Sequence, residues 1–291
     1  FFHDEGLDLE LFKAEPLKNK MMAVVSDRVD VAIMPFALDL FNELSAGGEL
    51  RVVADGRHAR KGDIFIPLMV RQDLSGQIRS FGDLKGRVVQ EPDPGTVSDY
   101  ILRCGLERAG LTLAQIRLVR TPFHLNAAVF AGGRVDVAAL IEPGASKAVR
   151  DGIAVRLSGM ERCQAAYTLE AALVYSGNFR KNRPGHARAF MRAYLKAARA
   201  YQSMPVEEIA RLLSKRTGFD TAPGEVSRLH IAPDGRIPVE AALAQMNYWA
   251  RIGLLKKAAP AGSIFDFSFL DEARPARPRA ARTRKRGGAS P

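Results

Sequence analysis

Apolar and polar positions along this chain follow two different periods, in segments that alternate along the sequence. Short runs with period two predict strands, and longer runs with a three-to-four-residue spacing predict helices. The predicted strands are Leu7–Phe12, Arg28–Met34, Leu50–Asp55, Asp63–Arg71, Arg87–Gln90, Ile116–Thr121, Arg134–Ile141 and Glu170–Gly177. The predicted helices are Leu17–Ser26, Asp39–Ser45, Thr96–Ala109, Leu125–Phe130, Ala187–Gln202, Val206–Lys215 and Val239–Ile252. Strands that alternate with helices predict an α/β fold with a largely parallel sheet covered by helices.

One segment of the pattern occurs twice. "SDRVDVAIM" (Ser26–Met34) resembles "GGRVDVAAL" (Gly132–Leu140), which begins 106 residues later. A polar turn before a Val/Ala strand is a common connection between a helix and a strand, so the likeness of the two segments can arise by chance. The other explanation is that the chain contains two similar α/β lobes. The loops that follow, Pro35–Asp39 and Glu142–Ser146, leave the carboxyl ends of equivalent strands, where open sheets bind ligands. If the lobes face each other, both loops border one cleft.

Composition is that of a globular protein with an uneven charge. Of 291 residues 47% are apolar, yet no run of 18 apolar residues could span a membrane. The net charge is +11, and seven basic residues without any acidic one lie in 274–291, which leaves +4 for residues 1–273. We expect the tail to be a disordered, solvated extension; contact with phosphates of nucleic acid or acidic lipid is the alternative. No pattern for specific nucleic-acid binding is present.

Residues for common catalytic chemistry are scattered. Cys104 and Cys163 form neither a disulfide framework nor a zinc site by their number, and we expect both to be buried thiols. The histidines do not cluster, and neither a P-loop nor a GxGxxG motif after a strand is found. We therefore expect no enzyme, no metal and no cofactor.

Several segments in order resemble one family. "FFHDEGLDLELF", "RVDVAIM", "DLKGRVV", "PGTVSDYILRCGLERAGL", "GGRVDVAALIEPGAS" and "FDFSFLDEA" are similar to the substrate-binding proteins of nitrate/sulfonate/taurine-type ABC importers. The resemblance covers about residues 1–273. It implies the type 2 periplasmic-binding-protein fold, with two α/β lobes joined by two crossover strands. The implied domains are lobe 1 (1–73 and 170–273), lobe 2 (74–169) and the basic tail (274–291).

The resemblance also carries expectations about context. The family has an export signal, a first strand and a first helix before the "FF…EGL" segment, so we expect residues 1–291 to belong to a longer, exported chain whose first lobe-1 strand precedes Phe1. It implies a periplasmic or cell-surface-anchored location and an ABC permease as partner. We expect a monomer with hinges near Met69–Asp73 and Tyr167–Ala172.

The strongest candidate site is the helix start "PGTVSD". Thr96 with Asp99 three residues later is typical of a capping box, which needs no ligand. The same backbone N–H groups, together with the Thr96 and Ser98 hydroxyls, also suit an anion, and Gly95 permits close approach. The family binds ligands at the matching segment, so Gly95, Thr96, Val97 and Ser98 are candidate ligand-binding residues.

Further candidates come from loops that match the family's cleft. Phe36 stacks on a ligand or is buried in the core, and Arg57 or His58 pairs with an anion or lies in a solvated loop. His124 contacts the ligand or caps a helix. Glu142 binds an ammonium or hydroxyl or braces the hinge; Ile141 replaces an aromatic residue of many relatives, which leaves the ligand class open.

The resulting interpretation is a solute-binding protein that captures a small organic anion, such as a sulfonate, taurine, nitrate or aromatic acid, and closes around it. Two alternatives share the fold. One is an enzyme similar to those of thiamine-pyrimidine biosynthesis, which uses a cysteine cluster and iron. The other is a regulatory ligand-sensing domain.

Overall fold

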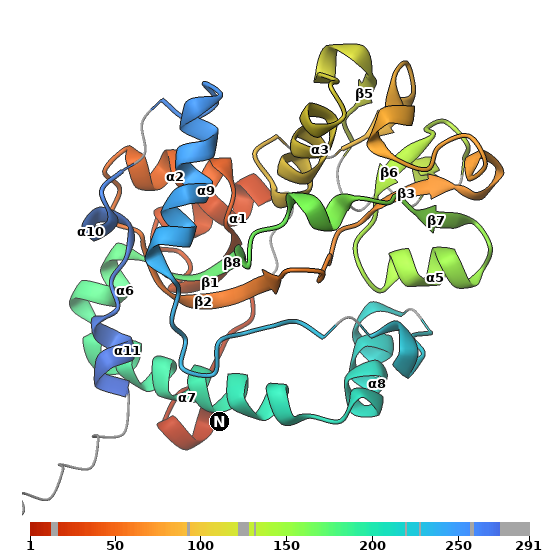
Figure 1. Ribbon diagram of the computed structural model, residues 1–291. Coiled ribbons are helices and arrows are strands. Elements are labelled where there is room, and N and C mark those ends of the chain that lie inside the picture. The colour runs from red at the N-terminus through yellow and green to blue at the C-terminus, as the bar shows by residue number, and fades with distance from the viewer. Residues whose placement is uncertain are drawn as a thin grey trace, which may run out of the picture.

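A computed structural model describes residues 1–12, 17–91, 94–121, 128–130, 132–218, 220–226, 228–256 and 259–273. Two β-sheets lie side by side with helices packed on their faces (Figure 1). The basic tail 274–291 lies outside the described residues, and of the predicted helix Leu125–Phe130 only 128–130 are described, in helical conformation.

Three strands form the first sheet. β8 (Tyr167–Tyr175) lies between β1 (Val31–Pro35) and β2 (Arg51–Arg60) and runs antiparallel to both. The prediction of a largely parallel sheet is wrong here, because a hydrophobic run indicates that a strand is buried but not which way its neighbours run. Within the described residues β1 forms one edge of this sheet.

Five short strands form the second sheet, in the order β5-β4-β6-β3-β7. Their bounds are β3 Leu68–Arg71, β4 Val88–Gln90, β5 Arg117–Val119, β6 Val137–Ala139 and β7 Ala154–Arg156. β4 is parallel to β5 and β6, whereas β3 is antiparallel to β6 and β7, so this sheet is mixed. The sequence pattern does not predict β7, since three residues are too few to display a period.

Helices cover both faces of each sheet. Around the first sheet lie α1 Leu17–Val25, α2 Leu38–Ser45, α6 Gly177–Asn182, α7 Pro184–Ser203, α9 Val239–Arg251, α10 Ala261–Ile264 and α11 Ser268–Ala273 (Figure 1). Beside the second sheet lie α3 Val97–Arg108 and α5 Gly144–Arg150, and α8 Val206–Thr217 follows α7.

The core follows the alternation of the strands. Val52 and Val174 pack with α2 and α9, while Val53 and Leu173, one residue along each strand, pack with α6, α7 and α11. The second sheet divides in the same way between α3 on one face and α5 on the other. Neighbouring strand residues point to opposite faces, so each sheet forms two apolar layers.

The predicted strand Leu7–Phe12 is absent. Residues 7–12 adopt no regular secondary structure, and the side chains of Leu11 and Phe12 are 78% and 52% exposed. The segment before it is anchored on α7 instead, where Glu5 forms ion pairs with Arg192 and Lys196 at 2.7 Å. Alternation alone does not make a strand, because a strand also needs a partner edge for its backbone hydrogen bonds.

The two cysteines form a disulfide. Cys104 on α3 is bonded to Cys163 in the 3₁₀ turn Met160–Cys163, with the Cα atoms 5.8 Å apart. The expectation of two buried thiols is therefore wrong. The cysteines are 59 residues apart in sequence, and only the packing of α3 against this turn brings them together.

The chain crosses between the sheets twice, at residues 61–67 and 157–166. The Gln164 side chain joins these crossings: it accepts a hydrogen bond from the Gly62 N–H at 2.9 Å and donates one to the Asp63 carbonyl at 2.6 Å. The first crossing lies before the predicted hinge Met69–Asp73, since Met69 and Val70 are paired on both sides within the second sheet.

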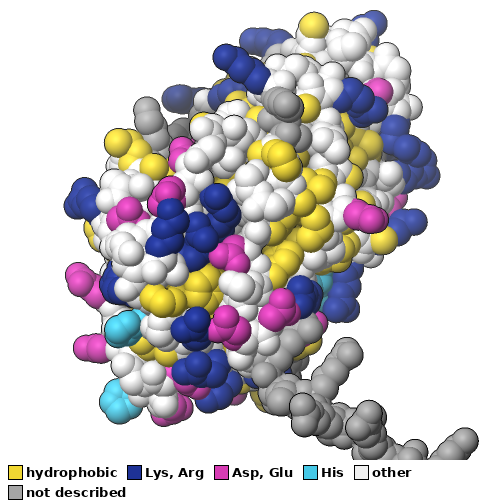
Figure 2. Space-filling model, turned by 90° about the vertical axis from the view of Figure 1, so that its left-hand side faces the viewer, with side chains coloured by type: hydrophobic (Ala, Val, Ile, Leu, Met, Phe, Trp, Pro, Cys, Tyr) yellow, Lys and Arg dark blue, Asp and Glu magenta, His cyan; other side chains and the backbone are white. Residues whose placement is uncertain are grey.

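The face formed by α6, α10 and α11 carries mixed charge. Figure 2 shows basic and acidic side chains interspersed there with apolar ones. Ion pairs account for part of this mixing, including Arg180 with Asp266 at 3.2 Å and Lys181 with Glu49. In the described part of the chain, no helix combines the length and apolar character that crossing a membrane requires.

Candidate ligand-binding cavity

The start of α3 is pressed against the start of α2. The N–H of Leu38 donates to the carbonyl of Gly95 at 3.2 Å. Gly95 has a φ of 79°, and a Cβ built on it would lie 2.2 Å from the Cβ of Leu38. Glycine meets both demands, the left-handed backbone and the close approach.

A cavity of about 150 Å³ lies at this contact. Its walls come from elements beside the first sheet and from α3 beside the second. α3 and the residues before it contribute Gly95, Thr96, Val97 and Tyr100. β8, α9 and the loop after β1 contribute the other aromatic rings, which are those of Phe36, Tyr167, Tyr248 and Trp249. Among the described lining residues, none carries a formal charge.

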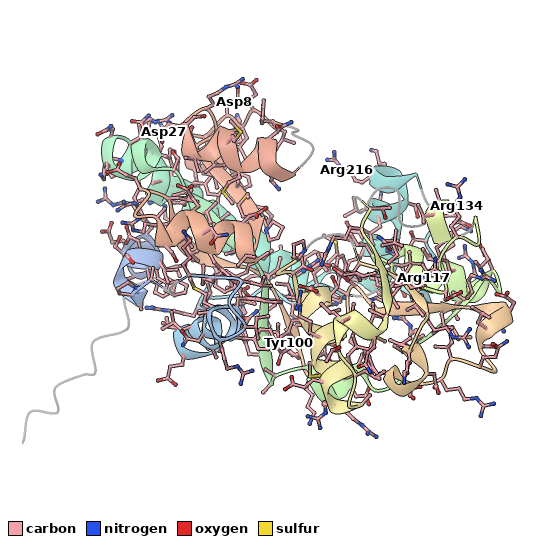
Figure 3. All side chains as sticks on the ribbon, turned by 90° about the horizontal axis from the view of Figure 1, so that it is seen from above. Asp8, Asp27, Tyr100, Arg117, Arg134 and Arg216 are labelled. Atoms are coloured by element: carbon pink, nitrogen blue, oxygen red, sulfur yellow. A yellow bond between two sulfur atoms is a disulfide. The ribbon has the colours of Figure 1, made fainter. Side chains whose placement is uncertain are left out.

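Tyr100 joins the two halves of the wall. Its ring meets the ring of Tyr248 edge-on at 4.7 Å and that of Trp249 at 6.4 Å, and its side chain packs against the apolar cores of both sheets. Figure 3 shows Tyr100 where α3 approaches the part of the molecule that holds α9. Closing or opening this approach therefore changes the aromatic wall.

Few polar groups of the wall remain for a ligand. The amide of Gln245 is used by the backbone of Leu169, accepting from its N–H at 2.9 Å and donating to its carbonyl at 3.0 Å. The hydroxyl of Tyr167 is buried and has no hydrogen-bond partner among the described residues. Burial also raises the pKa of Tyr167 well above its usual value, so this hydroxyl stays neutral and can donate or accept.

A buried carboxyl group lies directly behind the helix start. Glu91 is fully buried, and its Oε1 accepts hydrogen bonds from the hydroxyls of Ser98 at 2.9 Å and Thr96 at 3.1 Å. Its Oε2 has no partner within the described residues. Burial raises the pKa of Glu91 to about 8, and the nearby Asp99 adds to the rise. At pH 7 this carboxyl group is therefore mainly neutral.

Asp99 forms three further contacts at the start of α3. The Asp99 N–H donates to the Thr96 hydroxyl at 3.3 Å, as the predicted capping box requires. The Asp99 carboxylate, however, accepts from the N–H of Gly95 at 2.9 Å and forms an ion pair with Arg103 at 3.0 Å. Glu91 thus takes the two hydroxyls that the sequence analysis offered to an anionic ligand, and Asp99 takes the N–H of Gly95 beside them.

Arg57 and His58 lie in a second cluster, beside the first crossing. Arg57 forms a buried ion pair with Glu170 at 2.8 Å, and His58 Nδ1 lies 2.6 Å from Asp55 Oδ2. Burial raises the pKa of Glu170, and the neighbouring Arg57 opposes that rise. The ring of His58 stacks on Tyr167 at 4.6 Å, so Tyr167 touches both this cluster and the cavity.

The other candidates lie apart from the cavity. Glu142 forms an ion pair with Arg156 on β7 and accepts a hydrogen bond from the Ser146 N–H at 3.0 Å, which joins α5 to β7. His124 lies outside the described residues. Of the predicted residues, the cavity thus brings together Phe36, Gly95, Thr96 and Val97, with Ser98 behind them.

Sequence reasoning did not single out Glu91, Tyr100, Tyr167, Tyr248 or Trp249. The four aromatic residues of this set lie on helices and strands at positions typical of a core, because periodicity does not distinguish a ring that faces a core from one that faces a cavity. For Tyr100 a signal did exist, since it lies one helical turn after Thr96 and so shares its face of α3.

The part of the chain that the structure describes holds no group of three or more His, Cys, Asp or Glu side chains placed to bind a metal ion. Both cysteines are consumed by the disulfide, so neither supplies a thiolate in this state. The cavity is built for contact with rings and for few hydrogen bonds.

Comparison with solved structures shows the fold. The alkanesulfonate-binding protein SsuA from Xanthomonas axonopodis pv. citri, bound to MOPS, aligns with a TM-score of 0.67 at 19% identity over 85% of this chain and 84% of its own. The periplasmic nitrate-binding protein NrtA from Synechocystis PCC 6803 aligns at 0.70 and 13% identity, over 91% and 80%. A mutant of DSZB in complex with biphenyl-2-sulfinic acid aligns at 0.67 and 18% identity, over 94% and 92%.

Sequence comparison identifies the family. Among curated proteins, none matches the chain. The NMT1/THI5-like family matches it over residues 1–208, well beyond half of its length. Together with the solved structures, this match confirms the resemblance and the fold class predicted from the sequence. The chain belongs to the NMT1/THI5-like family.

Proposed function

We propose that this protein is the solute-binding component of an ABC importer. The observation that carries the proposal is a cavity whose wall takes Thr96 and Tyr100 from α3 and Tyr248 and Trp249 from α9. A ligand that touches both parts stabilises the closed arrangement, and closure is the step that a transport protein needs. In this proposal the two lobes are the predicted ones, 1–73 with 170–273 and 74–169, with their borders moved to the crossings at 61–67 and 157–166, because β3 belongs to the second sheet and all of β8 to the first.

The importer context rests on likeness to SsuA and NrtA, whose names describe binding of alkanesulfonate and nitrate. The protein acts as a monomer in the periplasm or at the cell surface and presents its closed form to a membrane permease. The Cys104–Cys163 disulfide supports this location, because disulfides persist in oxidising compartments.

The ligand is a small organic molecule. The sequence favours an organic anion; the names of the two binding proteins describe one organic anion, alkanesulfonate, and one inorganic anion, nitrate. The cavity itself supports an aromatic ligand, because five aromatic rings line it. They belong to Phe36, Tyr100, Tyr167, Tyr248 and Trp249.

An enzyme on the same fold is the second candidate, because DSZB, a desulfurization enzyme, aligns over most of the chain. The disulfide weighs against cysteine chemistry here. In the binder proposal the ligand is released unchanged, whereas an enzyme would convert it.

The test uses Trp249, the single tryptophan of the sequence, as a reporter inside the cavity. Taurine, alkanesulfonates, nitrate, aromatic acids and uncharged ring compounds are screened by fluorescence and by thermal unfolding. A true ligand at about 100 times its Kd adds about 2.7 kcal/mol of stability and raises Tm by several degrees. Mass spectrometry then compares the ligand before and after incubation.

Trp249→Phe is the control, since it removes the fluorescence signal and keeps an aromatic wall. Recovery of the unchanged ligand from the protein supports the proposal. A product that accumulates with time overturns it in favour of an enzyme, and no response to any compound in either assay overturns binding at this cavity.

A further inference from the structure

The described walls of the cavity offer an anion no compensating charge. Its described lining residues include no Lys, Arg or His. The guanidinium groups of Arg103 and Arg57 are already paired, the first with Asp99 at 3.0 Å and the second with Glu170 at 2.8 Å. Burying a charge without a partner is costly, so the wall itself selects against a charged ligand.

The side chains at the start of α3 do not compensate for this lack. Its two hydroxyls, on Thr96 and Ser98, donate to Glu91, and the N–H of Gly95 donates to Asp99. An anion at this helix start would meet the Asp99 carboxylate and find both hydroxyls already bound to the mainly neutral Glu91. The raised pKa of Glu91 has the same cause, since burial and Asp99 disfavour negative charge at this place.

The size of the cavity and its aromatic walls fit a small ring. A cavity of about 150 Å³ is comparable to an engineered apolar cavity that holds benzene. The side chains around it include the rings of Phe36, Tyr100, Tyr167, Tyr248 and Trp249, and aromatic rings prefer offset or edge-on contacts with one another.

We propose that the cavity binds an uncharged compound of about one aromatic ring, held by the rings around it, and that Glu91 makes the site reject anions by occupying the hydroxyls of Thr96 and Ser98. This inference rests on the proposed binding function and narrows its ligand class away from sulfonates and nitrate.

The experiment compares benzamide with benzoate, which share a ring and a planar substituent and differ in charge. Binding of each to the full chain is measured at pH 7 through Trp249 fluorescence. We expect benzamide to bind at least about tenfold more tightly than benzoate, because only benzoate brings an unpaired charge into the wall.

Two variants of Glu91 separate its role from general packing. Glu91→Gln keeps an oxygen acceptor for both hydroxyls and should retain the preference for benzamide. Glu91→Ala removes the acceptor to which both hydroxyls donate and should reduce the preference by about tenfold through tighter benzoate binding. An unchanged ratio in a folded Glu91→Ala protein overturns the role of Glu91.

The wild-type comparison stands even where Glu91→Ala does not fold. Benzoate or taurine binding as tightly as benzamide overturns the ligand class and leaves the solute-binding function in place. Binding of none of these three probes overturns the ring ligand. Failure of the binding function itself is recognised separately, by the absence of any ligand in the wider screen or by product formation.

Discussion

At the scale of single residues, the site contains a backbone conformation and a buried carboxyl group that would each destabilise a protein without specific surroundings. Gly95 holds a left-handed backbone conformation against the side chain of Leu38. Glu91 is a carboxyl group with no exposed surface. Each is explained by the contact between α2 and α3, where space is short and water is excluded, and each gives a direct test of that contact.

Replacing Gly95 by alanine should destabilise the protein more than the same change at a comparable glycine. Gly95→Ala places a non-glycine residue at a φ of 79°, which costs about 1–2 kcal/mol, and its Cβ also collides with Leu38, which adds about 1–3 kcal/mol of overpacking. The measurement is the free energy of unfolding in urea.

Gly86→Ala is the matched control. Gly86 has a φ of 75° and nothing within 4 Å of an added Cβ, so it carries the backbone cost alone. Equal losses of stability in the two variants would mean that the close approach of α2 and α3 does not exist in solution.

Glu91 should make stability fall as the pH rises. Its folded-state pKa of about 8 lies above the ordinary 4.5, so the folded protein holds a proton that the unfolded chain has lost. The stabilisation is complete below pH 4.5 and is lost through about pH 8, with a slope of at most about 1.4 kcal/mol per pH unit. Asp99 and Arg120 are the charged groups that modulate it.

The measurement is the free energy of unfolding between pH 5 and 9 for the wild type and Glu91→Gln. The wild type should lose stability relative to the variant, which cannot ionise. Parallel curves would show that Glu91 has the same pKa in the folded and unfolded states.

At the scale of elements, local patterns predicted most strands and helices but not their partners. The strands at Val31–Pro35 and Val88–Gln90 and the helix Pro184–Ser203 lie where alternation or a helical stripe predicted them. Leu7–Phe12 has an equally clear alternation and forms no strand. Strand direction, sheet order and pairing depend on contacts distant in sequence, which a local period does not contain.

The candidate site shows the same division. Gly95 and Thr96 were predicted from turn and cap chemistry, which is local, and both line the cavity. Trp249 and Tyr248 reach it from a helix more than 140 residues later, where their pattern is typical of core packing. The role of Glu91 follows from three hydroxyl and carboxyl groups meeting in space, and nothing in the spacing of Glu91 from Ser98 predicts it.

The link between α3 and the Met160–Cys163 turn should contribute strongly to stability. Opening the Cys104–Cys163 disulfide, which closes a loop of 59 residues, should lower the free energy of unfolding by about 4 kcal/mol, because the unfolded chain gains freedom. The measurement is urea unfolding with and without a reductant.

The double variant Cys104→Ser/Cys163→Ser is the control for this prediction. It should be less stable than the oxidised wild type and should not respond to the reductant. A wild type whose unfolding is insensitive to the reductant, while thiol titration shows both cysteines free, would contradict the stabilising role of the link.

At the scale of the whole molecule, the two sheets differ in whether their strands come from one continuous stretch of sequence. Every strand of the second sheet comes from one stretch, Leu68–Arg156, whereas the first sheet joins Val31–Pro35 and Arg51–Arg60 to a strand that begins at Tyr167. The cavity lies where α3 beside one sheet meets α9 beside the other, so both must be complete before a ligand can be held.

The positions of these strands in the sequence have a consequence for the order in which the two sheets can form. β1 and β2 do not pair with each other; both pair with β8, which lies between them. When the chain becomes available from its N-terminus onward, the second sheet therefore has all its strands once Arg156 has appeared, while β1 and β2 wait for a partner more than a hundred residues after them. Until β8 appears, the backbone edges of β1 and β2 have no native neighbour, and unpaired strand edges favour aggregation.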